Sequence, residues 1–120
     1  SAKGTVKNLL GEDVEVMWVK GSGWDLGSIE APGLPALDLQ QLRKLREVES
    51  MTDEEMVREV RRCMLDPKGP SPSVETLLHA FLPHTFIDHS HADAILALSN
   101  RENGAELCNK IFGSRVAYLH

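Results

Sequence analysis

The sequence predicts a single α/β domain in which helices cover a sheet, and two observations predict it. Residues 14–19 (VEVMWV) are rich in β-branched and aromatic side chains, which is typical of a mostly buried strand. In the second half of the chain, segments with helical spacing alternate with short strand-like segments at residues 86–91 and 116–119. Such alternation indicates an α/β fold, and 120 residues allow one small domain.

Before residue 65 we predict one strand and two helices. A turn at residues 11–13 precedes the strand, and a loop with two glycines, residues 20–25, follows it. Asp38 can cap a helix that runs to about Val48, and residues 52–55 have the capping-box spacing for a helix that runs to about Met64. The inner faces are expected to carry Leu39, Leu42, Leu45 and Val48 in the first helix, and Met56, Val57, Val60 and Met64 in the second.

After the helix-breaking residues 66–70, a third helix is predicted. Residues 71–73 (SPS) offer N-cap and first-turn residues, which would place Glu75 in the first turn near the edge of the core. Its inner face is expected to consist of Val74, Leu77, Leu78 and Phe81. Beyond it we predict a strand at residues 86–91, helices at 92–100 and 102–112, the latter closed by Gly113, and a last strand at 116–119.

Charge and composition exclude several classes of function. The chain has 18 acidic and 13 basic residues and a net charge of -5, whereas a general nucleic-acid binder would show a basic patch. No apolar run approaches the ~20 residues of a membrane span, and Ser1 begins no signal peptide. The two distant cysteines fit a reducing compartment. We therefore expect a soluble, cytoplasmic protein that binds neither nucleic acids nor membranes.

His89 and His91 are the residues best suited to carry chemistry. On a strand, side chains at i and i+2 point to the same face, whereas on a helix they diverge by roughly 200°. Two imidazoles converging at the carboxyl end of a strand are a good start for a zinc site. A lone His-x-His is nevertheless a weak motif, and by itself it more often marks surface or packing histidines.

Glu75 and the segment KGSG (residues 20–23) each have two readings. Glu75 can complement the helix dipole, which spacing alone favours, or it can serve the metal as ligand or general base. Glycines after a strand let backbone N–H groups approach an anion, and Ser71 and Ser73 could add donors. A Gly-Ser-Gly segment taken alone is more often just a turn.

Together, KGSGWDL (20–26), SPSVE (71–75) and HSHADA (89–94) resemble the class II aldolase/adducin family in order and spacing. The nearest likeness is to the aldolase domain of bifunctional proteins that join a rhamnulose-1-phosphate aldolase-like domain to a short-chain dehydrogenase. The resemblance spans nearly the whole chain. It implies a three-layer α/β/α fold with a mainly antiparallel or mixed central sheet, of which residues 1–120 would form a part, incomplete at both ends.

The family's activity is zinc-dependent retro-aldol cleavage of a ketose 1-phosphate, of rhamnulose or fuculose type, to dihydroxyacetone phosphate and an aldehyde. By resemblance, His89 and His91 are ligands of the zinc or another divalent metal, and Glu75 is a ligand or the general base. The phosphate of the sugar phosphate would be bound by Ser22, Gly23, Ser73 and Val74. Because relatives form tetramers, a homo-oligomer is expected.

The chain also departs from the family pattern. The family domain is roughly twice as long, its third metal histidine lies beyond the chain, and His120 does not match that motif. We therefore expect no aldolase activity from these residues alone. Two alternatives remain: a sugar-phosphate epimerase or dehydratase that uses the same metal site, and a non-catalytic, adducin-like interaction module.

Overall fold

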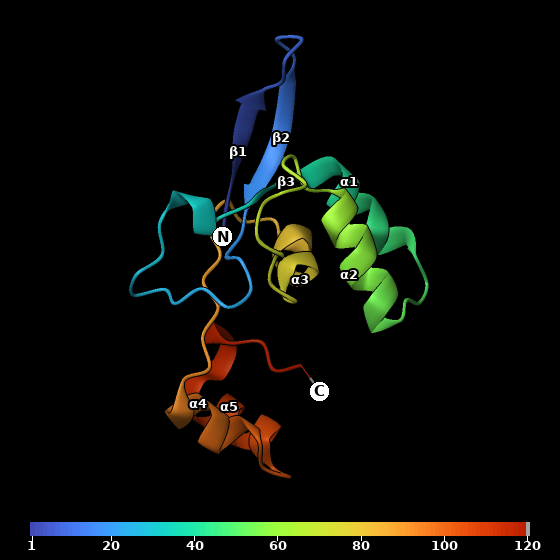
Figure 1. The fold of residues 1–120 in the computed structure, drawn as a ribbon. Helices are drawn as coiled ribbons and strands as arrows, with labels where there is room; N and C mark the ends of the chain where they lie inside the picture. The colour runs from blue at the N-terminus through green and yellow to red at the C-terminus, as the bar shows by residue number, and fades with distance from the viewer. Residues whose placement is uncertain (120) are drawn as a thin grey trace. The chain divides into compact units, whose positions relative to one another are not determined.

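The computed structural model describes residues 1–119, which form an α/β fold, as predicted (Figure 1). The chain divides into two compact units, Ser1–Asp88 and a second unit that begins at His89. His120, which the sequence analysis found not to match the third-histidine motif, lies outside the described residues. None of the helices within residues 1–119 has the length and apolarity that crossing a bilayer requires.

A three-stranded antiparallel sheet lies in the first unit. Its strands are β1 (Ala2–Lys7), β2 (Asp13–Trp18) and β3 (Ala36–Asp38), hydrogen-bonded in the order β1-β2-β3. The strand predicted at residues 14–19 is confirmed as β2, one residue earlier. β1 and β3 were not predicted, because β1 contains mostly residues that do not favour strands and β3 has only three residues.

The core of the first unit forms where the sheet packs against two helices. These are α1 (Leu39–Lys44), continued by a 3₁₀ turn at Leu45–Glu47, and α2 (Asp53–Arg62). Two expected core positions were wrong: Val48 and Val57 are each 45% exposed. Val48 follows the end of the 3₁₀ turn in extended backbone, and Val57 lies on the outer face of α2. The buried cluster consists of Met17, Val19, Leu37, Leu39, Leu42, Val60, Cys63, Met64 and Ala80.

The helix caps predicted at Asp38 and at residues 52–55 are confirmed, whereas the one predicted at residues 71–73 is wrong, since the residue before α3 is Glu75. The Asp38 side chain accepts a hydrogen bond from the N–H of Gln41 at 2.9 Å. In the capping box of α2, the Thr52 hydroxyl accepts from the N–H of Glu55 at 3.2 Å, and the Glu55 carboxylate accepts from the N–H of Thr52 at 2.9 Å. The two N–H groups that would otherwise be unsatisfied at this helix end are thereby bonded.

Replacing Thr52 by alanine should lower the free energy of unfolding by about 1 kcal/mol, because one cap bond is lost.

The Thr52 backbone hydrogen bond lowers the pKa of Glu55 from its usual 4.5. A depressed pKa in the folded state gives stability that is present above the unfolded-state pKa and is lost as the pH falls through the folded-state value. Urea unfolding from pH 6 to pH 3 should therefore be less pH-dependent in Glu55→Gln, and an unchanged pH dependence would contradict this account.

The third helix begins later than predicted. Helix α3 spans Thr76–Phe81, and residues 71–73 are extended instead, because Pro72 forms an antiparallel bridge with Gly21. Two residues expected on the inner face are exposed: Val74, which precedes the helix, is 64% exposed, and Leu78 is 51% exposed. The side chains of α3 that are buried belong to Thr76, His79 and Ala80.

The predicted strand at residues 86–91 is wrong beyond its first residues. Phe86 bridges Ala2, and the N–H of Ile87 bonds to the carbonyl of Ser1 at 3.1 Å, but the ladder with β1 goes no further than Ile87.

The second unit is helical, with α4 (Asp93–Ser99), α5 (Gly104–Phe112) and a 3₁₀ turn at Gly113–Arg115. Both helices were predicted, and Gly113 ends α5 with a φ of 59°. The strand predicted at 116–119 is wrong, since these residues pair with no strand among those described.

Candidate metal and phosphate site

Two of the motifs found in the sequence lie side by side in the first unit. Gly21 and Pro72 form an antiparallel bridge. The N–H of Ser22 donates to the carbonyl of Ser71 at 2.7 Å, and the N–H of Ser73 donates to the carbonyl of Lys20 at 3.0 Å. The structure thus brings together the two segments that sequence analysis assigned to phosphate binding, although they are about fifty positions apart in the chain.

The glycines of the first segment are needed for this approach. A Cβ on Gly21 would lie 3.0 Å from the Pro70 side chain and 3.1 Å from the carbonyl oxygen of Gly33. Gly23 has a φ of 81°, which other residues rarely adopt. Lys20 closes this loop rather than facing a ligand, because its Nζ donates to the carbonyl of Trp24 at 2.7 Å.

Several donors remain available at the exposed ends of these two segments. Ser22, Gly23 and Val74 are exposed, and Ser73 is half-buried. Within the described part of the chain, the Ser22 hydroxyl and the backbone N–H groups of Gly23 and Val74 have no hydrogen-bond partner. Uncharged donors grouped in this way can bind the oxygens of a phosphate.

Glu75 is the residue immediately before α3 and is half-buried. Its carboxylate accepts a hydrogen bond from the Ser73 hydroxyl, and the Ser73 carbonyl in turn accepts from the Thr76 hydroxyl at 2.5 Å. Val74, which was expected on the inner face of the third helix, is exposed instead. Ser73 instead fixes Glu75: its hydroxyl bonds the carboxylate and its backbone bonds the glycine loop.

His89 and His91 begin the second unit, and both are exposed. Their rings converge as predicted, with centroids 4.8 Å apart and planes inclined at 65°. The stated reason for convergence was wrong, because these residues are not in a strand. An irregular backbone brings the imidazoles together instead.

His79 is not among the site residues predicted from the sequence, and the structure shows that it is 6% exposed. Its Nδ1 lies 2.9 Å from the hydroxyl oxygen of Ser1, and its backbone N–H donates to the carbonyl of Glu75 at 3.1 Å. His79 therefore joins the start of β1 to the helix that follows Glu75. A spacing of four residues from Glu75 was the signal that could have indicated it.

By residue type, Glu75, His89 and His91 fit a divalent cation. One carboxylate and two imidazoles are side chains of the types that zinc accepts as ligands. The carboxylate belongs to the first unit and the imidazoles to the start of the second.

Comparisons with known proteins agree on one family. The sequence model described as "Class II Aldolase and Adducin N-terminal domain" matches residues 3–120. A Bacillus subtilis (strain 168) protein named "Uncharacterized oxidoreductase YuxG" is 45% identical over 119 residues, which are 99% of this chain and 17% of that protein. The solved N-terminal class II aldolase domain of a conserved protein from Thermoplasma acidophilum is 42% identical, with a TM-score of 0.88. That alignment covers 94% of this chain and 53% of the solved one.

Proposed function

The chain belongs to the class II aldolase and adducin family, and from that premise we propose that it takes part in metal-dependent cleavage of a ketose 1-phosphate. The substrate would be of rhamnulose or fuculose 1-phosphate type, and the products would be dihydroxyacetone phosphate and an aldehyde. The observation that carries the proposal is the pairing of the glycine loop with residues 71–73, which groups neutral donors beside Glu75.

In this proposal each residue has a distinct task. Ser22, Gly23 and Val74 bind the phosphate through the Ser22 hydroxyl and the backbone N–H groups, whereas both donors of Ser73 are bonded within the loop pair, to Glu75 and Lys20. His89, His91 and Glu75 hold the cation, which when bound would supply Lewis-acid polarisation of the substrate's carbonyl oxygen. Glu75 alternatively accepts the proton of the substrate hydroxyl as general base. Ser73 orients Glu75 in either role, because its hydroxyl bonds the carboxylate.

Other family chemistries would use the same residues. A sugar-phosphate epimerase or dehydratase needs the same phosphate and metal contacts, so these contacts define the substrate class and not the reaction type. The combination of two imidazoles with a carboxylate favours an enzyme over an adducin-like interaction module, which has no need for such a donor set.

Binding of dihydroxyacetone phosphate to the zinc-loaded chain, measured by calorimetry, tests this proposal. We expect dihydroxyacetone phosphate to bind at least about tenfold more tightly than dihydroxyacetone, since a hydrogen bond to a charged group is worth about 1.5–3 kcal/mol. Ser22→Ala should reduce this preference without removing it, because the backbone N–H groups of Gly23 and Val74 remain. Ser28→Ala, in the same exposed loop region, is the matched control and should keep it.

Equal affinity for the two ligands would overturn the phosphate assignment. The 120 residues alone are expected to bind dihydroxyacetone phosphate without cleaving a ketose 1-phosphate. They offer the metal two histidines and one carboxylate, whereas the family's metal site has a third histidine. Cleavage by this chain would contradict that expectation.

A further inference from the structure

The glycine loop and residues 71–73 form a short two-stranded ribbon with serine side chains on its outer face. The antiparallel bridge between Gly21 and Pro72 fixes the register, so Ser22 lies directly opposite Ser71. Opposite residues of an antiparallel pair project to the same face, with Cβ atoms about 5 Å apart, and the next residues along each strand project to the other face. Gly21 and Pro72 are buried, whereas Ser22 is exposed and Ser71 is half-buried. The side chains of Ser22 and Ser71 therefore project together from the outer face.

The hydroxyl of Ser71 is held by an arginine of α2. The Arg61 guanidinium donates a hydrogen bond to the Ser71 hydroxyl oxygen. A hydroxyl has two acceptor lone pairs and one O–H donor, so this bond leaves the O–H of Ser71 to donate elsewhere. Among residues 1–119 that O–H has no acceptor. Ser71 thus offers a second hydroxyl donor beside that of Ser22.

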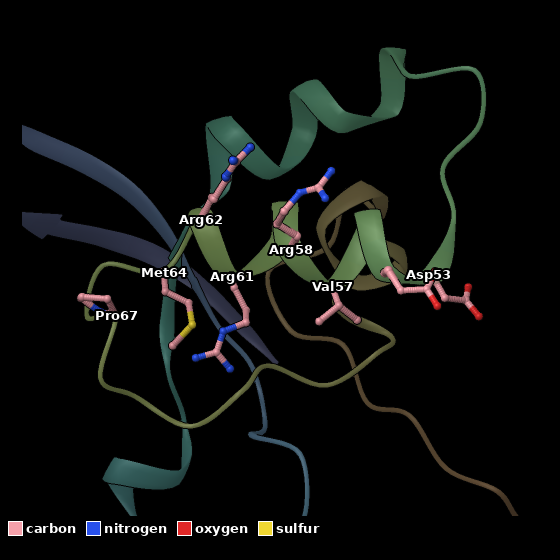
Figure 2. A pocket seen from close by; sticks show the side chains of 8 residues that line it. Asp53, Val57, Arg58, Arg61, Arg62, Met64 and Pro67 are labelled. Carbon is pink, nitrogen blue, oxygen red and sulfur yellow. The ribbon is translucent and has the colours of Figure 1, made fainter.

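Arg61 differs from the other two arginines of α2. Arg58 and Arg62 pair with Glu59, at 3.3 Å and 2.8 Å, and Figure 2 shows their side chains pointing away from the side to which Arg61 points. Arg61 forms no ion pair with any residue that the structure describes. Hydrogen bonds in a chain polarise one another, so a hydroxyl that accepts from a guanidinium is a stronger donor to an anion.

We propose that Ser71 is a further phosphate-binding residue, whose hydroxyl donates to a phosphate oxygen, and that Arg61 is the positioning residue that orients this hydroxyl. Ser71 thereby takes the part expected of Ser73, whose hydroxyl donates to the Glu75 carboxylate instead. The carbonyl of Ser71 also accepts the N–H of Ser22 at 2.7 Å, so the two donors are fixed relative to each other. This inference rests on the proposed function, from which it takes the phosphate-binding role of Ser22.

Calorimetry of the zinc-loaded chain with dihydroxyacetone phosphate and dihydroxyacetone tests this inference. Ser71→Ala should lower the preference for the phosphate by about fivefold or more, because a hydrogen bond to a charged group is lost. Arg61→Ala should lower it by a similar factor, and Arg61→Lys, which keeps a charged donor, should retain most of it. Arg62→Ala is the matched control on the same helix and should keep the wild-type preference, since Glu59 retains Arg58 as a partner.

The double variant Arg61→Ala/Ser71→Ala separates positioning from direct contact. It should bind dihydroxyacetone phosphate no more weakly than Ser71→Ala alone, because Arg61 acts through the Ser71 hydroxyl. A further loss in the double variant would mean that Arg61 acts on the phosphate by itself, and it would overturn the positioning role. Wild-type affinity for zinc and for dihydroxyacetone in these variants would show that each is folded with its metal site intact.

Two other results would contradict the inference in different ways. A wild-type preference that Ser71→Ala keeps in full would overturn the role of Ser71 and leave the proposed function standing. Equal binding of the two ligands by wild type would overturn the phosphate assignment itself, and the role of Ser71 with it. An equal loss of preference in Arg62→Ala would show that the total charge of α2 matters and not the bond to Ser71, which also contradicts the inference.

Discussion

Replacing His89 and His91 together by alanine is expected to abolish zinc binding by the chain. Wild type should bind about one zinc ion per chain, as neutral imidazoles are preferred zinc ligands. Loss of an outer-shell contact to a metal ligand already costs roughly 10–100-fold in affinity. Removal of two direct ligands should cost more than that. Competition with a chromophoric chelator at pH 7.5 measures the affinity.

His84→Ala is the matched control for this experiment. His84 is an exposed histidine a few residues earlier, and it belongs to neither the converging pair nor the proposed ligand set. Its replacement should leave zinc affinity unchanged. Equal zinc binding by wild type and the double variant would remove His89 and His91 from the proposed metal site.

Glu75→Gln separates the two roles left open for the carboxylate. If Glu75 is a ligand, the amide should weaken zinc binding, because a neutral oxygen replaces a charged one. If Glu75 is instead the general base, zinc affinity should be unchanged in the variant. The hydroxyl of Ser73 can still donate to the amide oxygen, so the local fold is retained in either case.

Sequence predicted the local features of this fold well. The caps at Asp38 and Thr52 depend on hydrogen bonds over three residues, and both are present as predicted. The helices α4 and α5 likewise follow from local spacing and from Gly113. Such features are determined by neighbours in the chain, which a single sequence displays.

Features that depend on distant partners were predicted poorly. The run at residues 116–119 has the composition of a strand but finds no strand to pair with among the described residues. β1 lacks that composition, yet it pairs with β2 over its full length. Strand formation is decided by the neighbouring strand, and one sequence does not reveal that neighbour.

In the candidate site, too, local features were predicted and contacts between distant segments were not. Both histidines were identified and their rings converge, but through an irregular backbone and not through a strand. The pairing of Gly21 with Pro72 could not be predicted from spacing, because the contact spans the whole of α1 and α2. The sequence offered both segments as possible donors to an anion, and the resemblance to a known family assigned them to one phosphate site before the structure brought them together.

Leu37→Ala is expected to have the largest effect on stability, a loss of about 2–5 kcal/mol in the free energy of unfolding. Leu37 is fully buried in β3, where it pairs with Met17 and bridges Met64, which lies two residues beyond the end of α2. Truncation leaves a cavity between sheet and helix that neither strand nor helix can close, since both are fixed by backbone bonds. Leu26→Ala, at an exposed position, should change stability by less than about 0.5 kcal/mol.

Leu37→Ala should lower the stability of the fold without changing the affinity of the candidate site for its ligands. Leu37 is not a proposed ligand or phosphate contact, so Leu37→Ala should bind zinc and dihydroxyacetone phosphate with wild-type affinity at temperatures where it remains folded. Denaturant titration gives the stability, and calorimetry at 10 °C gives the two affinities. Weaker zinc binding by the folded variant would mean that the position of Glu75 depends on the packing of the sheet. In that case the hydrogen bond from Ser73 would not be enough to hold the carboxylate in place.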